Sequence, residues 1–251
     1  HFGTGSWGLP VIRLTNQHAS LLGSTLEALM KPPKLTYLLV TILLLSFSDG
    51  WAQTGDTPAN LTGAAKVVQI ESVLELFGPD PTKWPVQHAD RWCWAASAEI
   101  IMSSYGHTSW EQCIQADDAY PGKDLPRTCC DDPYAPPCNR TGWPHFEYYG
   151  FHSLFTNKPL DWEQLKDQIE QGQPVAVAVK YLNPAFPGIS RGGHMGVIAG
   201  YAVLSDKEQA VLIVDPDGFH GGMWALYDEV FGDSSEFSRH WRTYYDIRPL
   251  R

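Results

Sequence analysis

Five cysteines constrain this 251-residue chain more than any other residue type, because four of them fall within 26 residues. The four are Cys113, Cys129, Cys130 and Cys138. Two disulfides in so short a stretch would close a loop and stabilise it by about 2–4 kcal/mol each. The total is odd, so Cys93 is left alone if the other four pair, and an unpaired cysteine needs a separate explanation.

The pairing of the four clustered cysteines has two open solutions. Of the three pairings that four cysteines allow, the one that joins the adjacent Cys129 and Cys130 is strained. This leaves Cys113–Cys129 with Cys130–Cys138, or Cys113–Cys130 with Cys129–Cys138. A four-thiolate zinc site is a weaker alternative, since zinc ligand pairs are usually separated by two to four residues. We therefore expect disulfides, no metal and no other cofactor.

Residues 30–52 have the pattern of a signal peptide, which agrees with disulfides because exported proteins form them. Met30 is followed by Lys31 and Lys34 and then by an uncharged, mostly apolar run of 13 residues. A membrane-spanning helix takes ~20 residues, so a signal peptide explains the run better than an anchor does. We expect cleavage before Gln53 and a secreted or periplasmic protein without membrane contact after cleavage.

The remaining chain divides into three segments by composition. Residues 1–29 precede the signal peptide and are interpreted as a non-native upstream extension. Residues 53–85 begin with small polar residues and end with prolines, which predicts a linker or a removable prosegment. Residues 86–251 are long enough to bury a core and form the expected folded domain.

The expected domain has helical patterns first and strand patterns later. Helices are predicted at 92–105, with Asp90 as N-cap, and at 161–171, and strands at 175–181, 194–203, 210–215 and 241–247. Helices followed by consecutive strands indicate an α+β fold with an antiparallel sheet. The formal net charge of −10 and the absence of a basic run exclude a protein that binds the phosphate backbone of nucleic acids.

Cys93 falls at the start of the first expected helix, between Trp92 and Trp94. The helix dipole and the unpaired backbone N–H groups of a first turn stabilise a thiolate, which is the form that acts as a nucleophile. Gln87, six residues earlier, can donate its amide to an oxyanion. A lone cysteine in an apolar run is usually a core residue, but the spacing to Gln87 favours the catalytic interpretation.

His194 and Asp215 are the candidate partners of this cysteine. His194 opens an apolar strand after two glycines, where a partner can approach closely, and its imidazole can take up and return a proton. Asp215 ends another apolar strand and can orient that imidazole. The alternatives are a structural core histidine and an ordinary Asp-Pro-Asp-Gly turn, with Asp217 as a weaker orienting group.

The order of Gln87, Cys93, His194 and Asp215 resembles the papain-like cysteine peptidases, and most closely their compact bacterial branch of secreted effector proteases and double-glycine leader peptidases. The segments WCWAA, GGHMGVIAGY and VDP carry the resemblance. It implies a helical subdomain with the cysteine, packed against an antiparallel sheet with the histidine and the aspartate. By this resemblance Gln87 is the oxyanion donor, Cys93 the nucleophile, His194 the base and Asp215 the orienting group, which is an asparagine in plant and lysosomal relatives.

The resemblance implies a secreted cysteine endopeptidase that acts on protein or peptide substrates. A transglutaminase-like acyl transferase has the same order of residues and differs only in the acceptor of the acyl group. An exported binding module that kept the fold and lost catalysis is the non-enzymatic alternative. These motifs specify neither the cleavage specificity nor the oligomeric state.

Overall fold

The computed structural model describes residues 61, 64–78, 85–119, 128–182, 190–204, 207–217, 222–231 and 238–251. The expected upstream extension and signal peptide, residues 1–29 and 30–52, lie outside the described residues. Among the helices of the described part, none has the length and apolar character that a membrane span requires.

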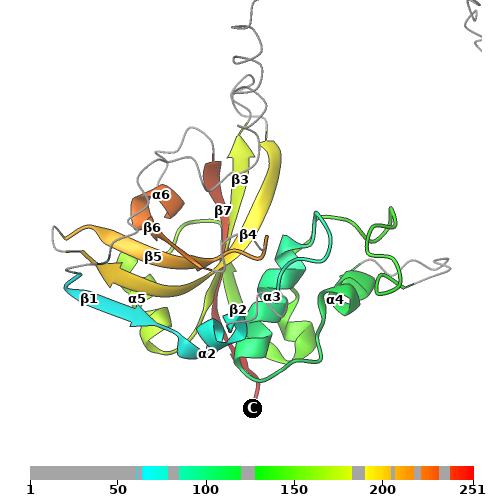
Figure 1. Cartoon of the computed structure of the whole chain (residues 1–251), viewed down its shortest axis with the longest axis horizontal. Helices are drawn as coiled ribbons and strands as arrows, with labels where there is room; N and C mark the ends of the chain where they lie inside the picture. The colour runs from blue at the N-terminus through cyan, green and yellow to red at the C-terminus, as the bar shows by residue number, and fades with distance from the viewer. Residues whose placement is uncertain are drawn as a thin grey trace, which may run out of the picture. The chain divides into compact units, whose positions relative to one another are not determined.

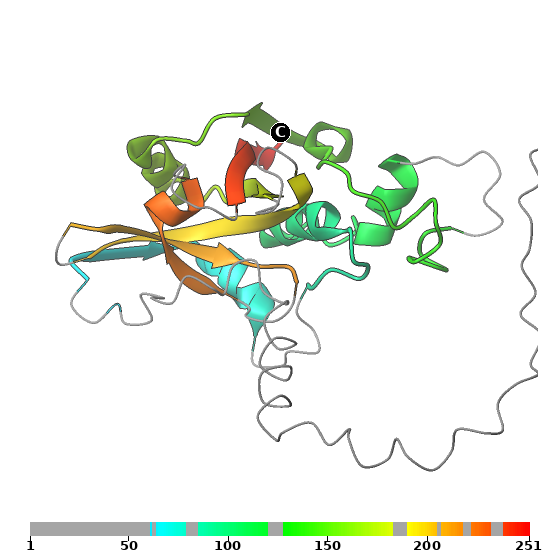
Figure 2. The ribbon, with the colours of Figure 1, turned by 90° about the horizontal axis from the view of Figure 1, so that it is seen from above.

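The described chain has the α+β architecture that the sequence predicts. Figures 1 and 2 show α3 and α4 on one side of the domain, and the strands with α5 and α6 on the other. In chain order the elements are β1 (Lys66–Gln69), α2 (Glu71–Leu74), η1 (Glu75–Phe77), α3 (Cys93–Ser104), α4 (Gln112–Ala119), η3 (Phe146–Tyr149), β2 (Phe151–Thr156), α5 (Trp162–Glu170), β3 (Val175–Leu182), β4 (Ser190–Val203), β5 (Gln209–Val214), β6 (Met223–Leu226), α6 (Tyr227–Phe231) and β7 (Ser238–Pro249).

Strand β4 is the centre of the sheet. Within the described residues seven strands pair in the order β2-β7-β3-β4-β5-β6, with β1 on β4, and all of these pairs are antiparallel. β4 pairs along residues 190–198 with β3 and along residues 197–203 with β5. β1 pairs with residues 200–203, so it continues the side of β4 that β3 leaves. The position of β4 therefore depends on three neighbouring strands.

Helix α3 is buried on most of its faces, as expected of a helix at the centre of a domain. It ends in a Schellman motif, in which the N–H of Gly106 donates to the Ser103 carbonyl and the N–H of His107 to the Met102 carbonyl. Gly106 has a φ of +84°, which a residue with a side chain rarely adopts. The helix therefore ends where the sequence predicts.

The segment from β1 to η1 contributes to the sheet and to the core. β1 pairs with β4, and the side chains of Ile70 and Val73 are buried in the main core. Lys66 Nζ lies 2.6 Å from a carboxylate oxygen of Glu170 on α5. This part of residues 53–85 is therefore joined to the domain by backbone pairing, apolar packing and an ion pair.

The disulfides connect α4 to the segment that follows it. Cys113 on α4 is bonded to Cys130, with the Cα atoms 4.8 Å apart, and Cys129 is bonded to Cys138, with a Cα separation of 5.4 Å. The structure thus contains the second of the two pairings that the sequence leaves open. Cys93 is the free cysteine.

A count of free thiols distinguishes the two pairings. The variant with Cys113→Ser and Cys130→Ser keeps both partners of the Cys129–Cys138 bridge, so the unreduced protein should present one free thiol, that of Cys93. The variant with Cys113→Ser and Cys129→Ser breaks both bridges and should present three. Titration of the unreduced proteins with a thiol reagent measures the counts, and the reverse result would contradict the pairing described here.

Candidate active site

Cys93 is the first residue of α3, so its thiol lies at the helix N-terminus. The N-cap is Trp92, and no side chain caps the helix, so the sequence-based choice of Asp90 as N-cap is wrong. The first N–H groups of a helix have no acceptor within the helix, and the dipole is positive at this end. The sulfur of Cys93 therefore lies at the positive end of α3, next to unpaired N–H donors.

Two tryptophan side chains connect the start of α3 to the disulfide-bonded segment by hydrogen bonds. The indole N–H of Trp92, which is fully buried, donates to the Cys138 carbonyl at 2.9 Å. The indole N–H of Trp94 donates to the Arg140 carbonyl at 3.2 Å. These bonds flank Cys93 on both sides in the sequence, so the bridged segment helps to fix where the thiol lies.

His194 lies on β4, and a hydrogen bond between α3 and β4 holds this part of the strand close to Cys93. The hydroxyl of Ser97, one turn along α3 from Cys93, donates to the backbone carbonyl of Met195 at 3.1 Å, and both residues are buried. Before His194, a Cβ added at Gly193 would lie 2.8 Å from the ring of Trp241. Only glycine therefore allows this close approach of the tryptophan.

Asp215 follows β5 and accepts a hydrogen bond from His194. Nε2 of His194 lies 2.7 Å from Oδ1 of Asp215, and both side chains are largely buried. The same oxygen accepts the backbone N–H of Asp217 at 2.9 Å, so Asp215 also forms the turn that its sequence context predicts. The turn holds the Asp215 carboxylate in position, and the carboxylate orients the imidazole ring of His194.

The imidazole of His194 forms a hydrogen bond with Asp215 through Nε2 and lines the same cavity as Cys93. Because Nε2 is taken by Asp215, Nδ1 is the ring nitrogen left for the thiol. Burial alone lowers the pKa of His194, but the hydrogen bonds and negative charges of Asp215 and Cys93 outweigh it and raise the pKa to about 10. The site therefore favours a charged imidazole beside the sulfur.

A cavity opens beside these groups. Its walls are mainly apolar and aromatic, and the side chains of Cys93 and His194 reach it. The lining residues are Cys93, Trp94, Thr141, Gly142, Trp143, Ala178, Gly193, His194, Met195 and Trp241. The cavity thus offers an apolar compartment directly next to a thiol and an imidazole.

Gln87, the fourth residue that the sequence singles out, lies beside the turn that carries Asp215. Its backbone N–H donates to the Pro216 carbonyl at 2.6 Å. Its Nε2 makes a long contact of 3.5 Å with the Asp90 carbonyl, and its Oε1 is buried without a hydrogen-bond partner among the described residues. The structure therefore brings Cys93, His194 and Asp215 together, and Gln87 is not among the residues that line the cavity.

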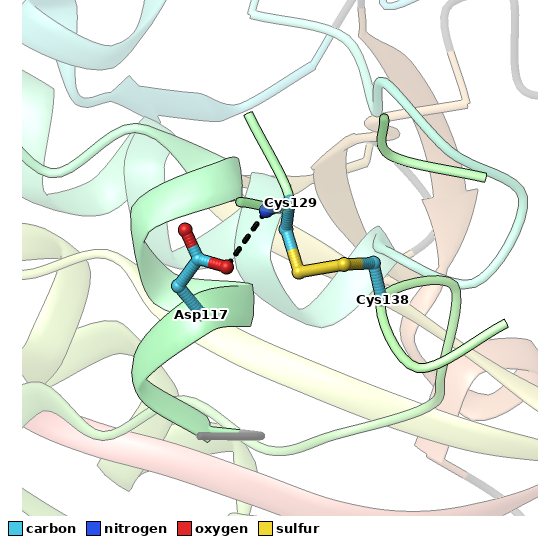
Figure 3. A group of neighbouring side chains, drawn as sticks. All are labelled: Asp117, Cys129 and Cys138. Carbon is cyan, nitrogen blue, oxygen red and sulfur yellow. Dashed lines mark hydrogen bonds between the residues drawn. A yellow bond between two sulfur atoms is a disulfide. The ribbon is translucent and has the colours of Figure 1, made fainter. Parts of the chain in front are cut away.

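The described residues contain one group that could resemble a metal site, namely Asp117, Cys129 and Cys138. Figure 3 shows why these side chains are close together. The two sulfur atoms are bonded to each other, and Asp117 Oδ1 accepts the backbone N–H of Cys129 at 2.7 Å. Disulfide sulfurs are not thiolate ligands, so the hydrogen bond and the bridge account for the group.

Sequence reasoning missed most of the cavity wall. Trp143, Thr141 and Gly142 belong to the loop before η3, and nothing in their local pattern indicates that the loop reaches Cys93. Gly142 is packed so closely that a Cβ there would lie 2.6 Å from the Trp94 ring. The available sequence signal for this loop is a glycine followed by a tryptophan next to the disulfide-bonded segment. This signal is weak.

The family of the chain follows from a match over this whole region. A family model, that of the Peptidase C39-like family, matches residues 80–247, a span that contains the cysteine, the histidine and the aspartate. The chain belongs to the Peptidase C39-like family. This membership confirms the resemblance to papain-like cysteine peptidases and supports cysteine peptidase activity on protein or peptide substrates.

Solved structures similar to this Peptidase C39-like protein include two plant proteases. The bromelain protease from Ananas comosus, in complex with the E64 inhibitor, is 12% identical with a TM-score of 0.33, covering 73% of this chain and 98% of its own. The proform of the ragweed pollen allergen Amb a 11, a cysteine protease, is 13% identical with a TM-score of 0.32, covering 76% and 67%. The classification of the chain rests on the family match. No curated protein matches the chain.

Replacing Asp215 by asparagine should lower the pKa of His194. The carboxylate stabilises the imidazolium and raises its pKa, so removing the charge should lower the pKa by about 1–3 pH units and bring it back towards its ordinary value. Titration of the histidine ring by NMR measures this. Asp217→Asn is the matched control and should change the pKa little, because Asp217 contributes a backbone N–H to the turn. Equal pKa values in wild type and Asp215→Asn would contradict the assignment.

Proposed function

We propose that the chain is a secreted cysteine endopeptidase in which Cys93, His194 and Asp215 form the catalytic triad. The observation that carries the proposal is the hydrogen bond of His194 with Asp215, with Cys93 and His194 lining the same apolar cavity. Each of the three residues has a neighbour that activates or orients it. This is the arrangement that nucleophilic catalysis by a thiol needs.

The geometry supports a mechanism in two half-reactions. Cys93 transfers its proton to Nδ1 of His194, and the thiolate attacks the carbonyl carbon of the scissile bond. When the resulting tetrahedral intermediate collapses, the imidazolium protonates the leaving amine and a thioester remains on Cys93. His194 then takes a proton from water, the hydroxide attacks the thioester, and the acid product leaves as the thiol is restored. Asp215 holds the ring and its charge throughout.

We propose that the backbone N–H of Cys93 and Nε2 of Gln87 stabilise the oxyanion of this intermediate. The N–H of Cys93 belongs to the first turn of α3 and has no acceptor within the helix. Among the described residues, Nε2 of Gln87 has only the long contact with the Asp90 carbonyl. An amide so weakly engaged can turn towards a developing negative charge at little cost, and such donors are worth about 10²–10³ in kcat.

Export is the part of the proposal that the disulfides support. Two bridges between four cysteines are typical of proteins that leave a reducing compartment. The signal-peptide pattern of residues 30–52 indicates how the chain is exported. The free thiol of Cys93 then persists in an oxidising environment because its four potential partners are already paired.

Cleavage of casein by the protein and its Cys93→Ala variant tests the proposal. The wild type should release new amino termini, and the variant should lose this activity by several orders of magnitude, because no nucleophile replaces the sulfur. Equal melting temperatures of the two proteins would show that the fold is kept. Incorporation of an added amine into casein without new termini would instead establish the acyl transferase. Undiminished cleavage by Cys93→Ala would contradict the nucleophile assignment.

A further inference from the structure

Three cations lie on the face of the sheet that carries the cavity. Lys180 on β3 is directly opposite Arg239 on β7, and Ala178, which lines the cavity, is opposite Arg242. Residues that pair across antiparallel strands share a face, and so do residues two apart on one strand. Lys180, Arg239 and Arg242 therefore share the face of Ala178, and we call them the cationic rim.

Two members of the cationic rim rest on the tryptophans of the cavity wall. The ammonium nitrogen of Lys180 lies 4.8 Å from the centre of the Trp241 ring. The guanidinium carbon of Arg242 lies 4.2 Å from the centre of the Trp143 ring and 4.7 Å from that of Phe155. The two tryptophan rings are themselves in edge contact, with centroids 4.7 Å apart. The cations are thus held in place next to the compartment that receives the substrate.

The cationic rim forms no ion pair in the described part of the chain. None of the ion pairs recorded there includes Lys180, Arg239 or Arg242. The hydrogen bonds of Arg242 go to neutral groups, the Asn157 amide oxygen and the Tyr244 hydroxyl. Like charges directly opposite each other on a sheet are unfavourable. The net charge of the chain is −10, so acidic residues outnumber basic ones in the sequence as a whole. The described part of the chain thus leaves these cations available to a carboxylate of a bound peptide.

We propose that the cationic rim selects peptide substrates that carry a glutamate or aspartate side chain next to the residue bound in the tryptophan cavity. The inference rests on the proposed peptidase function and specifies its substrate class. The guanidinium of Arg242, held over two aromatic rings, is preorganised and can donate a charge-assisted hydrogen bond to a carboxylate. An apolar side chain in the cavity and a carboxylate on the rim together define the preferred substrate.

Matched peptides test this substrate preference. Two synthetic peptides of otherwise neutral residues each contain a single phenylalanine. One has glutamate on both sides of the phenylalanine, and the other has glutamine in the same positions. The wild type should cleave the glutamate peptide with a kcat/KM about 5–30-fold higher than the glutamine peptide. The preference should decrease in high salt, because rim charges are accessible to ions. It should be lost in the double variant of Lys180→Gln and Arg242→Gln and reduced in Lys180→Gln alone.

Lys207→Gln is the matched control, because it removes the same charge from an exposed lysine at the β4–β5 turn. It should keep both the activity and the preference for glutamate. A wild type that cleaves both peptides equally, or a double variant that retains the preference, would overturn the proposal.

Binding to the Cys93→Ala variant separates this inference from the peptidase proposal. The variant should bind the glutamate peptide about 5–30-fold more tightly than the glutamine peptide, and the same two rim substitutions in its background should make the affinities equal. If the wild type cleaves neither peptide, the peptidase proposal fails while the binding ratio still tests the rim. Equal affinities of Cys93→Ala for the two peptides would overturn the rim proposal whatever the outcome for cleavage.

Discussion

The packing of α3 against β4 is the contact on which the candidate site depends. Cys93 and His194 are about a hundred residues apart in the chain, and the buried hydrogen bond from Ser97 to the Met195 carbonyl joins their elements within one turn of the cysteine and one residue of the histidine. A buried hydroxyl left without its acceptor would be costly, so this bond fixes the register of helix and strand as well as their distance.

Different parts of the structure position β4 and α3. β3, β5 and β1 all pair with β4. Asp215 follows the end of β5 and accepts a hydrogen bond from His194. On the other side, the Cys129–Cys138 bridge holds a segment whose carbonyls bind the indoles of Trp92 and Trp94. The disulfides, which look like a separate stabilising device in the sequence, thus act on the residues that flank the thiol.

Prediction from the sequence succeeds where local chemistry determines the structure. Gly106 ends α3 because its φ is positive, and β3 forms from a run whose residues 175–179 are continuously apolar and β-branched or small. Asp90 is not the N-cap because the buried indole of Trp92 binds the Cys138 carbonyl and sets where the chain enters the helix, a contact over 46 residues. For the same reason, the cysteine pairing and the place of Trp143 and Trp241 in the cavity depend on distant segments and follow from no local pattern.

The pKa of His194 in the absence of Cys93 tests the central claim most directly, because it reports whether the sulfur acts on the imidazole. The pKa of His194 is raised to about 10, and the negative charge of Cys93 is one of the causes, so the pKa should fall in Cys93→Ala. Titration of the histidine ring by NMR in the two proteins measures the difference. An unchanged pKa of His194 in Cys93→Ala would contradict the pairing of Cys93 with His194, and with it the proposed catalytic site.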